Sequence, residues 1–199
     1  MTNKEKELAS LYEKMEAQIA VLYAPDKKRL VRGDGSAQSS IVLIGEAPGE
    51  QEALEGRPFV GKAGRVLDEF LQLSGIARSS LYITNTVKVR PTAISRTGRR
   101  INRAPNAEEL ALFAPWLKKE LSIIKPKLIV TLGNVALRAI SEQKSAVIGK
   151  FHGEFMLVPA GFRVYPIYHP AAVIYNRSLR EVYESDLKKL NEFIKTNDI

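Results

Sequence analysis

Apolar and polar residues follow two patterns along this chain, and each pattern predicts one kind of secondary structure. Short apolar runs predict buried strands at about residues 40–45 and at residues 81–85, 128–132 and 164–168. Apolar residues at helical spacing predict an N-terminal helix at about residues 2–23, ending before Pro25, and further helices near 63–74, 110–124, 135–141 and 179–194. Because strands and helices alternate, we predict an α/β fold, a three-layer α/β/α sandwich around a mainly parallel four-stranded sheet.

Local signals mark where several of these elements begin and end. Asn106 and Glu109 form a capping-box pattern before the helix near 110–124, and Gly75 stops the helix near 63–74. Residues 151–168 predict a short hairpin that leads into the last strand. The length of 199 residues, without a linker or an internal repeat, predicts a single domain over residues 1–199.

The charge of the chain indicates what kind of partner it has. The formal net charge is +8 and the isoelectric point is about 9.6, which favours a polyanion, with nucleic acid ahead of a membrane surface. Solubilising charge is the alternative explanation. Residues 88–105 predict a long basic loop, because cations occur there without an acidic residue between them. They are Lys88, Arg90, Arg96, Arg99, Arg100 and Arg103.

The composition excludes several kinds of chemistry. The chain has no cysteine, which excludes disulfides, thiolate zinc sites, cysteine nucleophiles and cysteine-ligated iron–sulfur clusters. The first 16 residues are charged and amphipathic, unlike a signal peptide, and the apolar runs are shorter than a membrane span. We therefore expect a cytoplasmic protein, monomeric and without a membrane partner.

Chemically useful side chains follow the predicted strands. Glu46 comes after the first strand, Asn85 ends the second and His169 follows the fourth, while Phe59 lies in the loop after Glu46. Open α/β sheets bind ligands at the carboxyl ends of their strands. A flat heterocycle can be stacked by an aromatic ring, read on its edge by an amide and stabilised by an imidazole. The set predicts a base-binding pocket, although a lone glutamate at such a position would be read as a helix cap or a loop brace.

The segment from Gly56 to Ala63 approaches the phosphate-binding pattern G-x-x-x-x-G-K-[ST] without completing it. Ala63 lacks the hydroxyl that holds magnesium, and Pro58 removes one backbone N–H group. Nucleotide hydrolysis is therefore disfavoured. Lys62, at the start of a predicted helix, can still meet one phosphate.

Four segments resemble the motifs of family four uracil-DNA glycosylases, in order and in spacing. They are Gly45–Gly49, Arg57–Gly64, Tyr82–Asn85 and His169–Ala171. The resemblance, which covers about Arg29 to the C-terminal helix, implies a glycosylase fold and a uracil-binding set of Ala47, Phe59, Asn85 and His169. It also implies that Glu46 supports the attacking water or the sugar cation, and that His169 stabilises negative charge on uracil O2.

The loop after His169 pushes into the duplex in such enzymes. Here it offers an apolar wedge, Ile174 and Tyr175, followed by Arg177 for a phosphate. The alternative is a surface loop in which Ile174 and Tyr175 pack back on the core. Together with Lys62 and the cations at 96, 99, 100 and 103, these residues form the expected DNA-binding set.

The chain departs from the family in one respect. Family four enzymes ordinarily carry four cysteines that bind a 4Fe–4S cluster, and the corresponding positions fall here near Ala20 and Tyr23, at Val89 and at Phe113. We expect no metal and no cofactor, with apolar packing in place of the cluster. The segment Arg96–Arg103 resembles the insertion of a uracil-trapping branch that has a histidine where Asn102 falls. Because an amide is a poor nucleophile, we expect turnover and no covalent adduct.

The leading hypothesis is a glycosylase that hydrolyses the N-glycosidic bond of uracil in DNA and leaves an abasic site. One alternative is a DNA-binding relative with weak or no catalysis. Another is a glycosylase for a different deaminated base such as hypoxanthine, which also presents a carbonyl beside an N–H group. His152 and Trp116 are interpreted as structural residues.

Overall fold

The apolar runs form the centre of a six-stranded sheet in the computed structural model, which describes residues 1–24 and 26–199. The strands, in the spatial order β1-β3-β2-β6-β8-β7, are β1 (Asp34–Gly35), β2 (Ile41–Gly45), β3 (Leu81–Asn85), β6 (Leu128–Leu132), β7 (Met156–Leu157) and β8 (Arg163–Ile167). The neighbouring strands β3, β2, β6 and β8 pair in parallel. The mainly parallel α/β sheet that the sequence predicts is confirmed.

The sheet has two more strands than the predicted four. Strands β1 and β7 pair antiparallel at its two edges and contain two residues each. Two residues are too few to show an alternation of apolar and polar side chains, so the sequence pattern does not reveal them. The predicted hairpin within 151–168 is confirmed, because β7 and β8 pair with each other.

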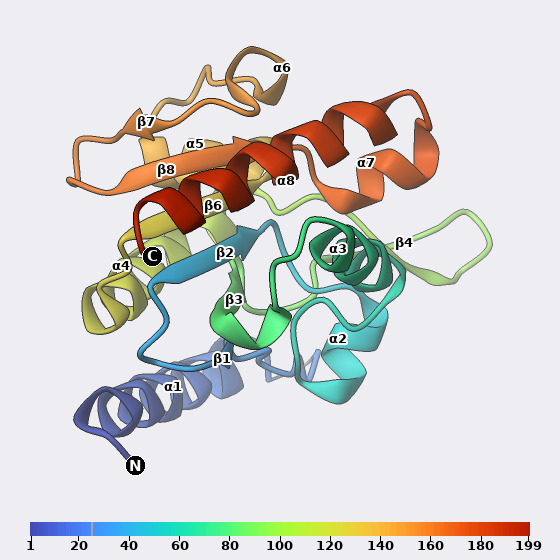
Figure 1. The fold of residues 1–199 in the computed structure, drawn as a ribbon. Helices are drawn as coiled ribbons and strands as arrows, with labels where there is room; N and C mark the ends of the chain where they lie inside the picture. The colour runs from blue at the N-terminus through green and yellow to red at the C-terminus, as the bar shows by residue number, and fades with distance from the viewer. Residues whose placement is uncertain (25) are drawn as a thin grey trace.

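Helices cover both faces of the sheet (Figure 1). They are α1 (Asn3–Leu22), α2 (Glu50–Glu55), α3 (Lys62–Leu73), α4 (Ala107–Ile124), α5 (Gly133–Ser141), α6 (Ile148–Phe151), α7 (Pro170–Tyr175), α8 (Leu179–Thr196) and the short 3-10 helix η1 (Arg78–Ser80). None of those in the described part of the chain is long and apolar enough to cross a membrane.

Alternate side chains of the same strands pack into two separate cores, which gives the predicted three layers. On β2, Ile41 and Leu43 pack with α3 and α8, whereas Val42 and Ile44 pack with α1, α4 and α5. In Figure 1, α8 crosses in front of the sheet. The alternation follows from the period of two along a strand.

The parallel register brings the carboxyl ends of the central strands to one edge of the sheet. Gly45 at the end of β2 lies opposite Asn85 at the end of β3, and Leu132 of β6 lies opposite Ile167 of β8. Figure 1 shows α2, α3, α7 and the β4 hairpin gathered on the side toward which these strands point. The residues that follow the strands are therefore neighbours in space.

The predicted basic loop is more ordered than expected. It contains the antiparallel strands β4 (Thr92–Ile94) and β5 (Arg100–Asn102), which form a two-stranded ribbon. Both strands are exposed or half-buried, so their sequences show little of the apolar alternation that predicts a strand. The predicted capping box of Asn106 and Glu109 is confirmed at the start of α4.

Lys88, at the start of this segment, lies in the core and not on the surface. Its ammonium lies 2.5 Å from the Glu120 carboxylate and contacts the hydroxyl of Thr84, and all three side chains are buried. Tyr82 donates a hydrogen bond of 2.8 Å to Glu120. Burial lowers the pKa of Lys88 from its usual value, and the nearby carboxylate acts in the opposite direction.

Candidate active site

A cavity of about 540 Å³ opens at the strand ends. It brings together most of the residues that the sequence predicts for the uracil pocket and its rim. These are Ala47, Phe59, Lys62, Asn85, His169, Ile174 and Tyr175. Gln51, Glu52 and Asn102 also line the cavity. The volume and the mixture of apolar and polar groups are typical of a small-molecule or base-binding site.

Phe59 holds its position through a strained backbone and two close glycines. Its φ is 53°, in the left-handed region that a bulky side chain seldom adopts, and its side chain is buried. A Cβ atom on Gly64 would lie 1.9 Å from the carbonyl oxygen of Phe59, and one on Gly45 would lie 2.6 Å from its ring. Glycine at both positions therefore lets the Phe59 loop pack onto β2 and α3.

His169 is the N-cap of α7, and this position fixes its tautomer. Its Nδ1 accepts a hydrogen bond of 3.1 Å from the backbone N–H of Ala171. Burial lowers the pKa of His169 to about 4, although the charge of Glu52 acts in the opposite direction. The imidazole is therefore neutral near pH 7 and carries its proton on Nε2, which makes it a hydrogen-bond donor.

Asn85 places its amide at the end of β3, beside Gly45. The residue is 4% exposed, and it lines the cavity. A Cβ atom on Gly45 would lie 2.4 Å from its Oδ1 atom, so the glycine makes room for it. A buried amide ordinarily finds hydrogen-bond partners, and a ligand in the cavity can supply them.

Glu46 lies at the exit of β2, where the sequence predicts it, but its side chain does not line the cavity. It is half-buried, and burial raises the pKa of its carboxyl from the usual value. Its carbonyl oxygen accepts a hydrogen bond of 3.0 Å from the N–H of Val87. The flanking Ala47 lines the cavity.

Glu52 is a site residue that the sequence analysis misses. Its buried carboxylate accepts hydrogen bonds from the backbone N–H groups of Gly49, Val60 and Gly61, at 3.1, 3.1 and 2.8 Å. It therefore joins the start of α2 to the loop that carries Phe59 and to the start of α3. Its position three residues after Gly49, where a capping-box carboxylate is expected, is the signal that could have revealed it.

The same bonds explain why the near-miss phosphate loop is not a phosphate cradle. The N–H groups of Val60 and Gly61, which a phosphate would need, already bind Glu52. Lys62 begins α3 and lines the cavity, as expected for a residue that can meet one phosphate. His152 pairs with Asp186 at 2.9 Å, and Trp116 donates to Gln18, in agreement with structural roles for both.

The wedge residues lie on the rim of the cavity. Ile174 is 42% exposed and Tyr175 is 89% exposed at the end of α7, so neither side chain packs back into the core. Arg177 is exposed just beyond them and does not line the cavity. An exposed tyrosine at the rim has the placement that a wedge requires, and its contact with DNA stays a prediction.

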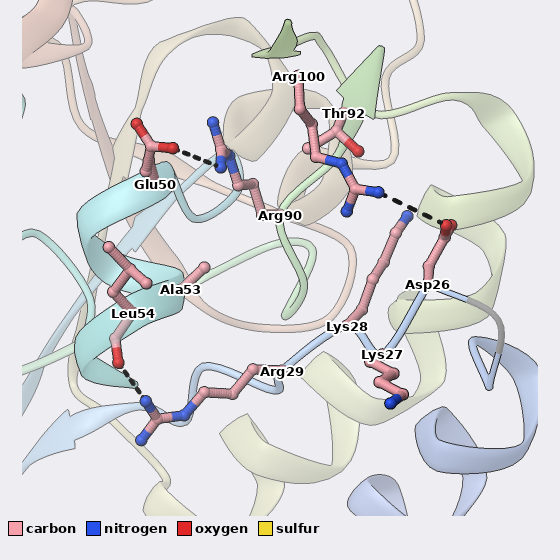
Figure 2. Close-up of a pocket in the computed structure, with 10 residues that line it drawn as sticks. All are labelled: Asp26, Lys27, Lys28, Arg29, Glu50, Ala53, Leu54, Arg90, Thr92 and Arg100. Atoms are coloured by element: carbon pink, nitrogen blue, oxygen red, sulfur yellow. Dashed lines mark hydrogen bonds and ion pairs between the residues drawn. The ribbon is translucent and has the colours of Figure 1, made fainter. Parts of the chain in front are cut away.

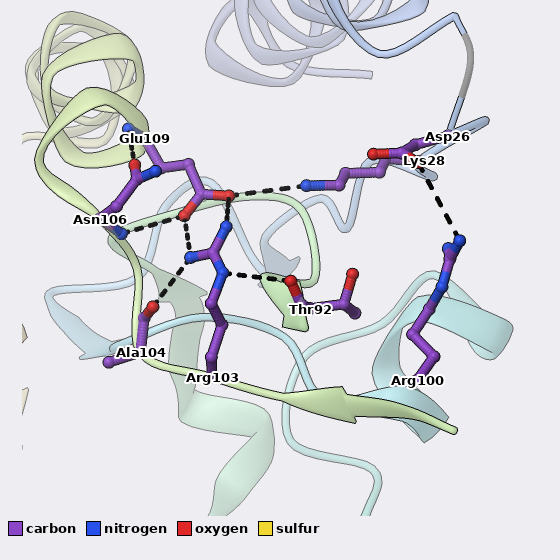
Figure 3. A network of polar contacts seen from close by, with 8 residues as sticks. All are labelled: Asp26, Lys28, Thr92, Arg100, Arg103, Ala104, Asn106 and Glu109. Carbon is purple, nitrogen blue, oxygen red and sulfur yellow. Dashed lines mark hydrogen bonds and ion pairs between the residues drawn. The ribbon is translucent and has the colours of Figure 1, made fainter. Parts of the chain in front are cut away.

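The cations of the hairpin have different surroundings. Arg96 and Arg99 are exposed near its tip, and Arg100 lines a second cavity near Asp26 (Figure 2). Arg103 instead forms two hydrogen bonds with the Glu109 carboxylate, at 2.6 and 2.9 Å (Figure 3). None of these four residues lines the first cavity. The structure thus leaves Arg103 fewer donors for DNA than its neighbours have.

The residues that stand where the family has its four cluster-binding cysteines do not fit an iron–sulfur cluster. Val89 and Phe113 are fully buried in an apolar cluster against which Tyr23 packs, whereas Ala20 is exposed outside it. Their side chains offer no thiolate, and the described residues contain no group of His, Cys, Asp or Glu able to hold a metal. The expected apolar packing is confirmed for Val89 and Phe113, which are buried, and for Tyr23, which packs against them from its partly buried position.

Comparisons with known proteins identify the family of the chain. A model of the uracil DNA glycosylase superfamily matches residues 32–197. The chain is 37% identical to the type-4 uracil-DNA glycosylase of Saccharolobus solfataricus, over 87% of this chain and 80% of that protein. It is 40% identical to the type-4 uracil-DNA glycosylase of Thermotoga maritima, over 85% of each. The crystal structure of SMUG2 from Pedobacter heparinus shares the fold, with a TM-score of 0.57 at 18% identity, over 81% of this chain and 76% of that one. The chain belongs to the uracil-DNA glycosylase superfamily.

Proposed function

We propose that this protein is a DNA glycosylase that hydrolyses the N-glycosidic bond of uracil in DNA and leaves an abasic site for base excision repair. The observation that carries the proposal is the convergence of the Phe59 ring, the Asn85 amide and the His169 imidazole in one cavity at the strand ends. The type-4 glycosylases at 37 and 40% identity support the same activity.

The cavity residues can recognise a flipped uracil. Phe59 stacks on the base, and the Asn85 amide accepts from one group of the uracil edge and donates to the next. Uracil presents a carbonyl acceptor at C4, whereas cytosine presents an amino donor there. The buried amide therefore pairs badly with cytosine. A site built on such hydrogen bonds rejects the wrong base more strongly than an apolar pocket does.

The chemistry needs stabilisation of two opposite charges. Breaking the bond builds negative charge on uracil O2 and positive charge on the sugar. Neutral His169 donates its Nε2–H to the developing oxyanion, while the Glu46 carboxylate stabilises the sugar cation or orients the attacking water. Each donor of this kind contributes about 3 kcal/mol to transition-state stabilisation.

DNA contacts come from the rim and from the hairpin. Ile174 or Tyr175 fills the gap left by the extruded base, and Arg177, Lys62, Arg96, Arg99 and Arg100 meet phosphates. Asn102 lines the cavity where the uracil-trapping branch has a histidine, and its amide is a poor nucleophile, so the enzyme turns over. A monomeric, cytoplasmic enzyme that works without metal or cofactor is part of the same proposal.

A panel of oligonucleotides tests the function. The purified protein is incubated in EDTA with single- and double-stranded DNA containing uracil, hypoxanthine or normal bases, and abasic sites are cleaved with alkali. We expect cleavage at uracil. Cleavage at hypoxanthine alone would move the substrate to a deaminated purine, and binding without any cleavage would favour the non-catalytic relative.

The Glu46→Gln variant tests the role of the carboxylate. We expect it to lose most of the activity while it still binds uracil-containing DNA, because glutamine keeps the shape and removes the charge. Full turnover by Glu46→Gln would contradict the proposed role.

A further inference from the structure

A second cavity, of about 180 Å³, lies between residues 26–29, helix α2 and the β4–β5 hairpin (Figure 2). Five cationic side chains and two carboxylates line it, which gives the lining a net positive charge. The cations are Lys27, Lys28, Arg29, Arg90 and Arg100, and the carboxylates are Asp26 and Glu50. Such a lining favours an anionic ligand.

One polar bridge separates this cavity from the candidate active site. Glu50 lines both cavities. Arg90, from the second cavity, donates to Glu50 at 3.1 Å and to the Oδ1 atom of Asn102 at 2.6 Å, and Asn102 lines the first cavity. A DNA strand that enters the first cavity and crosses this bridge therefore carries its phosphates to the second one.

Several of the cations are held in place by the protein. Arg29 donates to the carbonyl oxygens of Leu54 and Glu55 at the end of α2. Lys28 lies 3.5 Å from the Glu109 carboxylate and 4.3 Å from the centre of the Tyr23 ring. Binding to side chains that are already ordered costs less conformational entropy than binding to mobile ones.

One exposed ion pair in the cavity lining is the one that an anion can replace. Arg100 lies 4.0 Å from Asp26, and both side chains are about half exposed. Exposed pairs with this separation contribute little to stability. Figure 3 shows the contrast with Arg103, whose guanidinium is bound to Glu109 by two hydrogen bonds. Arg100 can thus turn from Asp26 to a phosphate at little cost.

We propose that the second cavity binds a backbone phosphate of the DNA strand whose uracil occupies the active site. The described residues that line the cavity include no aromatic side chain, so the site suits a phosphodiester and not a stacked base. The phosphate lies outside the uracil nucleotide, and Arg90, Arg29 and Arg100 supply the positive charge. The inference rests on the proposed function, because it concerns the same DNA strand.

Ala53 offers a matched pair of variants for the test. It lines the cavity from α2, where glutamate and glutamine are both good helix formers. Ala53→Glu places a carboxylate in the cavity, and Ala53→Gln has the same size without the charge. Leu73→Glu, on an exposed residue at the end of α3 that lines neither cavity, controls for the change in net charge.

Binding is measured with a strand that contains 2′-fluoro-deoxyuridine, because the fluorine destabilises the sugar cation and slows cleavage. We expect Ala53→Glu to bind roughly tenfold more weakly than Ala53→Gln, since like charges repel in the cavity. We also expect its plot of log K against log salt to be shallower by about one unit, the equivalent of one phosphate contact. Leu73→Glu should bind nearly as the wild type does.

A scan of single neutral methylphosphonates along the strand locates the phosphate. At one position outside the uracil nucleotide, the substitution should weaken binding by the wild type and by Ala53→Gln but not by Ala53→Glu. Equal binding by the two Ala53 variants, or the absence of such a position, would overturn the proposal. The proposal would also be overturned if inorganic phosphate bound the protein while no methylphosphonate position distinguished the two Ala53 variants. Uracil release by the wild type from unmodified DNA is scored separately, so a failed phosphate site and a failed glycosylase are distinguishable.

Discussion

The ring centroids of Phe59 and His169 lie 5.8 Å apart, although the two residues follow different strands of the sheet. The strained backbone of Phe59 and the N-cap position of His169 fix the two rings independently. A site assembled in this way is ordered before its ligand arrives, which is what transition-state stabilisation by fixed donors requires.

The low pKa of His169 predicts how the protein responds to acid. The folded-state pKa of about 4 lies below the ordinary value of 6.5, so the unfolded chain binds the proton more readily. Stability from this group is complete above pH 6.5 and is lost as the pH falls toward 4, by at most about 3.5 kcal/mol. NMR titration of the His169 ring should show no protonation between pH 6 and 7, and His152→Asn identifies its signals. An inflection near 6.5 would contradict the neutral donor.

Glu52→Gln should loosen the loop that carries Phe59. The amide cannot replace a carboxylate that accepts three backbone hydrogen bonds, so we expect the free energy of unfolding to fall by about 2 kcal/mol. Uracil excision should fall as well, because Phe59 loses its fixed position. Chemical denaturation and single-turnover rates measure both effects. Glu55→Gln, an exposed neighbour on α2, is the control, and equal behaviour of the two variants would remove Glu52 from the site.

The buried ion pair between Lys88 and Glu120 predicts a non-additive effect on stability. Lys88→Met leaves the Glu120 carboxylate buried without its cation, so we expect a loss of about 3 to 5 kcal/mol. Lys88→Met with Glu120→Leu removes both charges and should recover much of this loss. Urea denaturation of the single and double variants provides the comparison. A double variant that is less stable than Lys88→Met would refute this explanation.

Loss of Arg99 should weaken DNA binding, whereas loss of Arg103 should lower the stability of the fold. Arg99→Ala should weaken DNA binding and reduce the salt slope by about one unit, because Arg99 is exposed on the hairpin. Arg103→Ala should instead lower the free energy of unfolding by about 1 to 3 kcal/mol, because it leaves the buried Glu109 carboxylate without its main partner. Binding isotherms and denaturation curves are recorded for both variants. The assignment fails if Arg99→Ala destabilises the fold while Arg103→Ala does not.

The sequence predicts the sheet and the strand-end residues because both depend on strong local patterns. Short, mostly apolar runs identify β2, β3, β6 and the main part of β8, and parallel pairing brings their carboxyl ends together. The pattern therefore predicts that Asn85 and His169 share one site, and both line the cavity. The two-residue edge strands have no such pattern, and they were missed.

The remaining features depend on contacts that no local pattern encodes. Lys88 and Arg99 are both cations within one basic segment, yet Lys88 is buried because Glu120 of α4 reaches it through the core. Arg103 faces Glu109, whereas Arg99 faces solvent. Glu52 brings together N–H groups from two loops, and only the fold shows that they meet at one carboxylate.

The central claim is that the cavity at the strand ends excises uracil, and release of free uracil by the wild type and by Asn85→Leu tests it most directly. Leucine has nearly the shape of asparagine but cannot pair with the edge of the base. The wild type should release free uracil and leave an abasic strand. Asn85→Leu should release it at least about a hundredfold more slowly while it still binds DNA. No uracil from the wild type, or equal rates for the two proteins, would contradict the account.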